Sequence, residues 1–581
     1  MKQNKFNLKI RILNSIIILL SIIGLIVCIS ILFPQVRQII VDLAGRILHK
    51  EIIERKGWLN AFLSYAIGGI CVILFFDYCT LTNSGRSLVY KAKQEIKDCL
   101  SEIDFRSLLK PVLLLFGVYL LGILTIIRAN FLYMDDVSRS VEGGRMFYPF
   151  SRYVIEFASI FVHGDTNLTD ISPLPQMLAI LILSISSVLL VYILCNKKIT
   201  TVGLLASIPL GLSPYFLECL SFKFDAPYMA LSILASIVPF IFIARKKAFI
   251  FCSVVSLLIM CMTYQAASGI YPMIAVILCF KDWNGRKKPD KEILSFLSIA
   301  AFTFCFAMSF YKFFLMKPVY DGYAVNTMHP LSNMIPGILL NIKNYAKTIN
   351  SDFGIIWKTG IAIICILFVT KSICTSLRKK TLSFLASVLV ISVSFILSYG
   401  LYSMLSFFPD FLRTLYGFGV FLAILCIYVV SDYKKVATIS VLALNYCFLI
   451  FALSYGNAMA DQARYAEFRI GILLHDLSNL YPDQDGEEIK FQIKNSIDYA
   501  PSIKNISKHY PVIERLVDKR LGEIIWVNPW DNEYIWRHFN YNKRKKDYLY
   551  DFDSLNLPIV LDSYYHTIKG NENHCLVILK H

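Results

Sequence analysis

Two adjacent carboxylates, Asp135 and Asp136, follow a long apolar stretch, and Arg139 and Arg145 come shortly after them. A carboxylate in such a position can accept the proton of an attacking hydroxyl group, and a neighbouring charge can shift its pKa or hold the acceptor. The alternative is structural, because Asp is a common N-cap and either residue could cap a helix that begins at Val137. The residue types alone leave both interpretations open.

A second cluster contains Glu218, Lys223 and Asp225, at the point where one apolar stretch ends and the next begins. Charged side chains at or near membrane depth are costly unless they are paired or functional. The cluster is therefore a second candidate for a site. Its structural alternative is an ion pair between Lys223 and Asp225 at the tip of a helical hairpin.

Two further polar groups interrupt apolar sequence. Tyr264 and Gln265 lie in a polar break between two apolar stretches, where they can donate hydrogen bonds to a sugar or simply separate two helices. Arg413 lies at the start of another apolar stretch. A guanidinium group there matches the oxygens of a lipid phosphate in bidentate fashion, and its alternative role is to snorkel toward the membrane surface.

The elements that must position these residues are membrane helices. Of the 581 residues, 56% are hydrophobic and only 17% are charged, whereas soluble domains carry about 25% charged residues. This composition excludes disordered, collagen-like and disulfide-scaffold proteins. Because a spanning helix needs about 20 apolar residues, the sequence predicts an all-α polytopic membrane protein with about 13 transmembrane helices. The predicted spans lie near 13–33, 60–77, 110–127, 174–195, 199–215, 227–244, 248–263, 266–281, 293–315, 354–371, 382–405, 413–431 and 435–455.

The basic residues predict the orientation of these spans. The net charge is +17, and lysine and arginine gather in short loops between alternate apolar stretches, as the positive-inside rule requires of cytoplasmic loops. We therefore expect a multi-pass protein of the plasma membrane with a cytoplasmic N-terminus and with the polar clusters at the outer face. This distribution argues against a nucleic-acid partner. The motifs GxxxxGK[ST] and GxGxxG do not occur, which argues against ATP-driven transport by this chain alone.

The composition divides the chain into three predicted parts. These are an N-terminal transmembrane pair with a cytoplasmic loop at 1–109, a membrane catalytic domain at 110–455 with a large outer loop at 128–173, and an extracytoplasmic domain at 456–581. The last part has the composition of a water-soluble segment. Its early residues have an amphipathic helical pattern, and the apolar runs at 557–562 and 575–579 predict short strands. We expect a small α/β segment outside the membrane.

The order of the motifs resembles a known family. The run Asn130-Phe-Leu-Tyr-Met-Asp-Asp-Val-Ser-Arg139 is followed by Gly144-Arg145, then by Ser213-Pro-Tyr-Phe-Leu-Glu218 with Phe224-Asp225, and then by Tyr264-Gln265. This series resembles the membrane glucosyltransferases of the O-antigen-modifying Gtr type, within the GT-C superfamily. The resemblance covers roughly positions 110–470. Gly144-Arg145-Met-Phe departs from the Gly-Arg-Pro run expected in that family.

The resemblance implies a GT-C-like fold and a reaction. The donor would be a polyprenyl-phosphate sugar, with glucose as the sugar, made on the inner face by a synthase and moved outward by a flippase. The acceptor would be a cell-surface polysaccharide or a lipid-linked glycan. Asp135 or Asp136 would act as the general base, with inversion at the anomeric carbon. The candidate donor-binding residues are Arg413 and Lys223 near the leaving phosphate, with Arg139, Arg145, Glu218, Asp225, Tyr264 and Gln265 around them.

Paired carboxylates can also hold a divalent cation, so Mg²⁺ or Mn²⁺ at Asp135 and Asp136 stays open as a cofactor, although the sequence shows no further ligand set. Two other functions compete with glycosyl transfer: a transporter or flippase of lipid-linked oligosaccharides, and a glycan polymerase or ligase. A transporter would place ionisable residues near the middle of its spans. This chain has few there, which favours a site at the outer face.

Overall fold

The computed structural model describes residues 83–316, 328–432, 434–481, 490–522 and 552–580. The two predicted spans at 13–33 and 60–77 lie outside the described residues. The described part is mainly helical, and seven of its helical segments are long and apolar enough to cross a membrane. They are α5 (Phe105–Ala129), α8 (Leu174–Leu194), η4 with α14 (Gln265–Asn284), α15 with η5 (Asp290–Leu315), α17 (Ile355–Cys374), α18 (Lys380–Ser398) and α20 (Lys435–Leu480).

A bent segment gives an eighth crossing if it counts as one span. The helices α9 (Thr201–Ala206) and α10 (Pro209–Leu212) are followed by α11 (Pro214–Ser221), at an angle of 63°. Ser213 between them is extended, with φ −63° and ψ 147°, because the ring of Pro214 disfavours helical geometry in the preceding residue. The bend points α11, which carries Glu218, in a new direction.

Shorter helices complete the bundle. They are α12 (Ala226–Ile237) with η3 (Val238–Phe242), α13 (Lys246–Cys261) and α19 (Gly417–Val430). Every residue of α19 is buried. A Cβ atom at Gly419 would lie 2.6 Å from the carbonyl oxygen of Pro209, so the absence of a side chain lets α19 approach α10 closely. These helices correspond to the predicted spans at 227–244, 248–263 and 413–431, although they are shorter than a full crossing.

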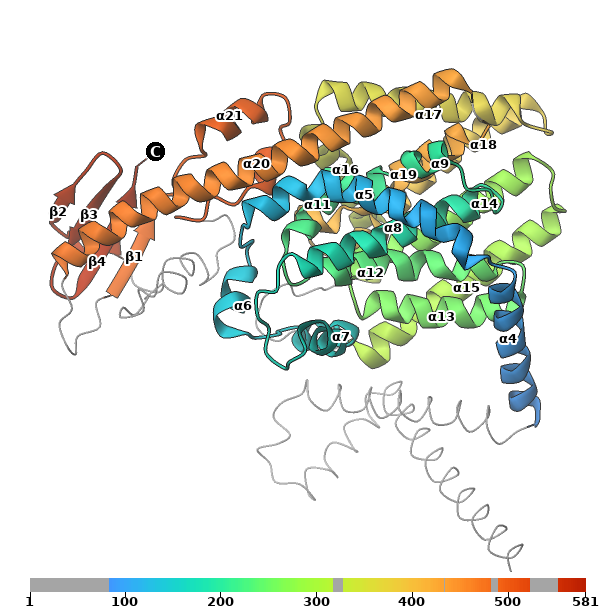
Figure 1. Ribbon diagram of the computed structural model, residues 1–581, viewed down its shortest axis with the longest axis horizontal. Coiled ribbons are helices and arrows are strands. Elements are labelled where there is room, and N and C mark those ends of the chain that lie inside the picture. Colours follow the sequence, from blue (N-terminus) through green and yellow to red (C-terminus); the bar gives the residue numbers. More distant parts are fainter. Residues whose placement is uncertain (1–82, 317–327, 433, 482–489, 523–551, 581) are drawn as a thin grey trace, which may run out of the picture.

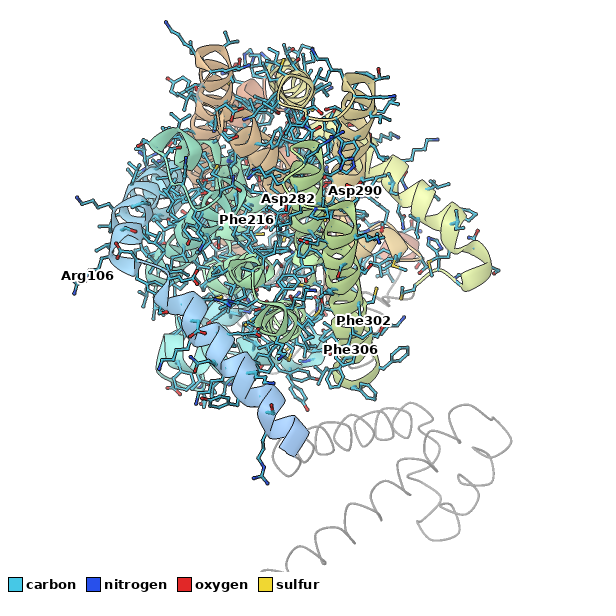
Figure 2. The ribbon with its side chains drawn as sticks, turned by 90° about the vertical axis from the view of Figure 1, so that its right-hand side faces the viewer. Arg106, Phe216, Asp282, Asp290, Phe302 and Phe306 are labelled. Carbon is cyan, nitrogen blue, oxygen red and sulfur yellow. The ribbon has the colours of Figure 1, made fainter. Side chains whose placement is uncertain are left out.

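The helix α4 (Asn83–Ser101) lies across one end of the bundle instead of along it (Figures 1 and 2). The Glu95 Oε2 atom accepts the backbone N–H groups of Lys247 and Ala248, at 3.1 and 3.0 Å. These groups belong to the first turn of α13, where backbone N–H groups lack helical partners. Glu95 therefore fixes α4 to the bundle. Figure 2 looks onto this end, with Phe216 inside the bundle and with Phe302 and Phe306, which are exposed, on its outer surface.

The opposite end carries short helices from the loops. There lie α6 (Asp136–Glu142) and α7 (Tyr153–His163), far from α4 in Figure 1. The segment between the predicted spans at 293–315 and 354–371 contains α16 (Met334–Asp352), a helix that the sequence pattern did not reveal.

The C-terminal part begins on the longest helix. The 46 residues of α20 continue without a break through position 456 and project beyond the bundle, past the end at which α6 lies (Figure 1). Its last turns pack against a sheet of order β1-β4-β3-β2, with β1 parallel to β4 and the other pairs antiparallel. The strands are β1 (Lys490–Lys494), β2 (Ile559–Asp562), β3 (His566–Gly570) and β4 (His574–Leu579). The predicted strands at 557–562 and 575–579 are confirmed as β2 and β4.

Candidate active site

Left-handed backbone at two non-glycine residues shapes the loop that carries the paired carboxylates. Asn130 ends α5 with φ 48°, and Met134 has φ 45° directly before Asp135. Such conformations cost of the order of 1–3 kcal/mol each and persist where the surroundings fix them, often at functional sites. Here they turn the chain from the end of α5 into α6 within a few residues.

Asp136 is completely buried and holds two loops together. Its Oδ2 atom accepts the backbone N–H of Tyr133 at 3.1 Å and that of Lys223 at 2.9 Å. Burial raises the pKa of the carboxyl group to about 8, although the two N–H groups and the Arg139 charge act in the opposite direction. The Oδ1 atom is also buried and has no hydrogen-bond partner in the described part of the chain.

Asp135 has a different environment, although it is the adjacent residue. It is exposed, and it occupies the N-cap position of α6 without a hydrogen bond from its side chain to the helix. The interpretation of Asp135 as a capping side chain is therefore wrong. Asp136 does not cap α6 either, because its partners are the N–H groups of Tyr133 and Lys223.

The predicted ion pair between Lys223 and Asp225 is also wrong. The Arg139 Nη1 atom lies 2.5 Å from Asp225 Oδ1, while the Lys223 Nζ atom lies 2.7 Å from Asp170 Oδ2 and 2.6 Å from Asn130 Oδ1. The partners come from the loop at 128–173, which packs onto the turn between α11 and α12. Arg139, Lys223 and Asp225 are all at least 95% buried, so each charge needs the partner that the loop supplies.

Glu218 and Arg413 form the next part of the site. Glu218 Oε2 accepts the backbone N–H of Arg413, and Glu218 Oε1 lies 3.7 Å from Arg413 Nη1. The guanidinium group lies 4.9 Å from the ring centres of both Phe222 and Phe411. Its Nη1 atom also donates to the Met134 sulfur at 3.4 Å. Met134 immediately precedes Asp135. The segment that carries the exposed carboxylate therefore contacts Arg413, the predicted phosphate ligand.

The remaining candidates are less closely connected. The Tyr264 ring stacks on that of Tyr416, with ring centres 6.1 Å apart. The Gln265 side-chain amide already donates to the Tyr311 hydroxyl at 2.8 Å and to a backbone carbonyl group. Arg145 forms an ion pair with Glu156 at 3.1 Å. The structure thus brings together Asp136, Arg139, Lys223 and Asp225 in one network, and Glu218 and Arg413 beside it, whereas Gln265 and Arg145 have partners of their own.

The C-terminal segment closes over this region, which the sequence did not reveal. The Leu516 carbonyl oxygen, in α22 (Ile513–Leu516), accepts the Tyr133 hydroxyl at 2.9 Å and the Tyr455 hydroxyl at 3.4 Å. The adjacent Arg515 donates from Nη1 to both carboxylate oxygens of Asp352, at 2.8 and 2.7 Å. No local motif marks these residues, because each contact joins positions more than 60 residues apart.

A small pocket opens between α5 and α8. Its lining includes the apolar residues Ile126 and Ile127 and the polar residues Asn130, Gln176, Ser221 and Lys223. The Gln176 Oε1 atom is buried and lacks a hydrogen-bond partner within the described residues. The pocket thus places polar groups next to an apolar helix surface, which suits the junction between a lipid chain and its polar head.

Comparison with known proteins decides the family. Residues 124–430, more than half of the chain, match the family model described as Glucosyl transferase GtrII. The chain belongs to the GtrII glucosyltransferase family. It is also similar to a protein of Salmonella phage P22 described as "Uncharacterized 55.3 kDa protein in gtrB 5'region", at 24% identity over 407 residues that cover 67% of this chain and 82% of that protein. No solved structure matches.

The GtrII domain contains all of the candidate residues from Asp135 to Arg413, whereas the closing segment with Arg515 and Leu516 lies beyond it. Family membership and the apolar helices together indicate a glycosyltransferase of a membrane, with a sugar donor and a glycan acceptor.

Mg²⁺ or Mn²⁺ at Asp135 and Asp136 stays a prediction from the sequence. One oxygen of Asp136 is taken by two N–H groups, and the described residues contain no group of three or more His, Cys, Asp or Glu side chains arranged to hold a metal ion. We therefore derive no step through a metal.

Proposed function

We propose that this GtrII glucosyltransferase transfers glucose from a polyprenyl-phosphate donor to a hydroxyl group of a cell-surface polysaccharide or a lipid-linked glycan. The reaction would take place at the outer face of the plasma membrane. The observation that carries the proposal is an exposed carboxylate, Asp135, whose neighbour Met134 contacts the guanidinium group of Arg413. A proton acceptor and a phosphate ligand then flank one position at the end of a helical bundle.

Asp135 is the general base in this proposal. As the acceptor oxygen bonds to the anomeric carbon, its proton passes to the Asp135 carboxylate, and the bond from that carbon to the phosphate oxygen breaks. A single displacement of this kind inverts the configuration. Asp136 is less suited to be the base, because its Oδ2 atom already holds two N–H groups and its raised pKa, about 8, keeps it largely protonated at neutral pH.

The leaving group is a phosphate that becomes more negative as the bond to the sugar breaks. Preorganised cations at such a position stabilise the transition state more than the substrate. Arg413 fits this role because the rings of Phe222 and Phe411 hold its guanidinium group in place. Lys223 lines the pocket beside Ile126 and Ile127, where the first units of the isoprenoid chain would lie.

The wider assignments belong to the same proposal. The chain would have about 13 spans, a cytoplasmic N-terminus and an extracytoplasmic segment after the last span. Its domains would be 1–109, 110–455 and 456–581, and a donor synthase and a flippase would supply the substrate. The first turn of α13, which α4 contacts through Glu95, carries Lys246 and Lys247, and these basic residues support this orientation.

The test uses the full chain in vesicles with a polyprenyl-phosphate glucose donor and surface glycan as acceptor. Asp135→Asn should reduce glucose transfer by about 10²–10⁴-fold, the usual effect of losing a general base. The control is Asp461→Asn on α20, a partly exposed acid paired at 3.8 Å with Arg464, which should transfer normally. Undiminished transfer by Asp135→Asn would refute the base assignment. Movement of the donor across the membrane without any transfer would instead indicate a flippase.

A further inference from the structure

Arg152 is a cation at the outer end of the bundle that the motifs did not identify. It immediately precedes α7, and its guanidinium carbon lies 4.9 Å from the centre of the Tyr264 ring and 5.4 Å from that of Phe150. Its Nε atom is buried and has no hydrogen-bond partner, and no carboxylate pairs with it in the described part of the chain. The side chain thus contacts aromatic rings, while its Nε donor has no acceptor among the described residues.

Three other cations of the loop at 128–173 and the neighbouring turn differ in this respect. Arg139 pairs with Asp225, Arg145 with Glu156, and Lys223 with Asp170. Each of these positive charges is therefore already offset by a carboxylate. A partly buried charge that lacks an offsetting carboxylate is costly, and such groups concentrate at ligand sites. An anion is the ligand that would satisfy Arg152.

Arg152 also faces the same aromatic surface as the proposed phosphate ligand. The Tyr264 ring that Arg152 covers stacks on the Tyr416 ring, with ring centres 6.1 Å apart, and Tyr416 lies three residues after Arg413. This pair of rings therefore links Arg152 to the segment that carries Arg413. A guanidinium group can bind two phosphate oxygens at once.

We propose that Arg152 is a second phosphate ligand, which binds the donor phosphate together with Arg413 while the Tyr264 ring holds its guanidinium plane. The inference rests on the proposed function, because it takes the ligand to be the phosphate of a polyprenyl-phosphate sugar. It also gives Tyr264 a role: the ring orients the arginine instead of contacting the sugar.

The experiment measures the binding of a polyprenyl phosphate without sugar to the full-length protein in detergent. Arg152→Gln should weaken binding by about ten- to a hundred-fold, the effect of losing a charge-assisted hydrogen bond. Arg152→Lys keeps the charge but loses the planar fork, and should fall between Arg152→Gln and the unmodified chain. Arg464→Gln, an exposed arginine on α20, is the matched control and should bind normally. Unchanged binding by both Arg152 variants would overturn the proposal.

Two further measurements test whether the ligand is a lipid-linked phosphate and whether the inference holds independently of the proposed function. Inorganic phosphate at the same concentration should not compete with the lipid, and equal competition would overturn the assignment to a lipid-linked phosphate. A glucose-transfer assay on the same preparations distinguishes the inference from the function on which it rests. Weakened lipid binding by Arg152→Gln would support the phosphate site even if the unmodified chain transfers no glucose. Normal glucose transfer by Arg152→Gln, with an unchanged KM for the donor, would overturn the proposal that Arg152 binds the donor phosphate.

Discussion

The carboxylate of Asp136 accepts the backbone N–H of Lys223 at 2.9 Å and thereby joins two loops that are 87 positions apart. The same oxygen accepts the N–H of Tyr133. One buried side chain therefore fixes the exit of α5 against the turn between α11 and α12. Asp135, the adjacent carboxylate, is left outside this link and is exposed.

The environment of Asp136 predicts a dependence of stability on pH. Its pKa is raised from 3.8 to about 8, so the carboxyl group of the folded protein stays protonated while that of the unfolded chain ionises. The contribution of Asp136 to the free energy of unfolding is then complete below about pH 4 and is lost as the pH rises toward about 8. Asp136→Asn should remove this loss, because an amide oxygen can accept the same two N–H groups. Thermal unfolding at pH 5 and pH 8 should show a smaller difference for the variant than for the unmodified chain. Asp461→Asn is the control, and an equal difference in all three proteins would contradict the prediction.

Arg413→Ala should impair the donor more than the acceptor. The guanidinium group is the proposed phosphate ligand, and it lies between the rings of Phe222 and Phe411. Loss of a charge-assisted hydrogen bond should raise the KM for the donor by about tenfold or more and leave the KM for the acceptor nearly unchanged. Initial rates at varied concentrations of each substrate measure both constants. An equal rise in the two would remove Arg413 from the phosphate role.

Asp225→Asn should destabilise the fold. Arg139 and Asp225 are both almost fully buried, with their charged groups 2.5 Å apart. Removal of one partner of a buried ion pair typically costs about 3–5 kcal/mol, because the other charge stays buried without compensation. The variant should unfold at a lower temperature, and the double variant Arg139→Gln/Asp225→Asn should recover part of the loss. A double variant less stable than the single one would show that the pair has no such coupling.

The sequence allowed the membrane helices to be predicted because each of them is an apolar run of recognisable length. It allowed β2 and β4 to be predicted for the same reason. The helices α4 and α16 were missed. Their burial faces are set by tertiary contacts, such as that of Glu95 with the start of α13, and these contacts leave no long apolar run.

The candidate site was predicted by residue type but not by pairing. Asp135, Asp136 and Arg413 were singled out because charges are unusual beside apolar stretches. The structural alternative for Lys223, an ion pair with Asp225, was wrong, because the two residues are close in the chain but the folded loop at 128–173 supplies Asp170 as the partner. Arg152 had no motif at all. Its lack of a carboxylate partner among the described residues is apparent only after the other residues have paired.

The contact between Arg515 and Asp352 predicts that the C-terminal segment controls the site from outside the GtrII domain. Asp352 is buried, and burial raises the pKa of its carboxyl group although Arg515 acts against the shift. Arg515→Ala would leave this carboxyl group with Tyr215 as its hydrogen-bond donor and would loosen α22, whose Leu516 carbonyl accepts the Tyr133 hydroxyl. Amide hydrogen exchange of residues 510–518 should then become faster by about tenfold or more, the effect of losing a charge-assisted hydrogen bond.

Glucose transfer should fall in the same variant, because Tyr133 lies three residues before Asp136 and its N–H binds that carboxylate. Lys504→Gln is the matched control. It breaks an exposed ion pair with Asp498 in the same segment and should change neither exchange nor transfer, since exposed pairs contribute little. Faster exchange with undiminished transfer would show that the closing segment only covers the site. Loss of transfer with unchanged exchange would show that Arg515 acts directly instead of through α22.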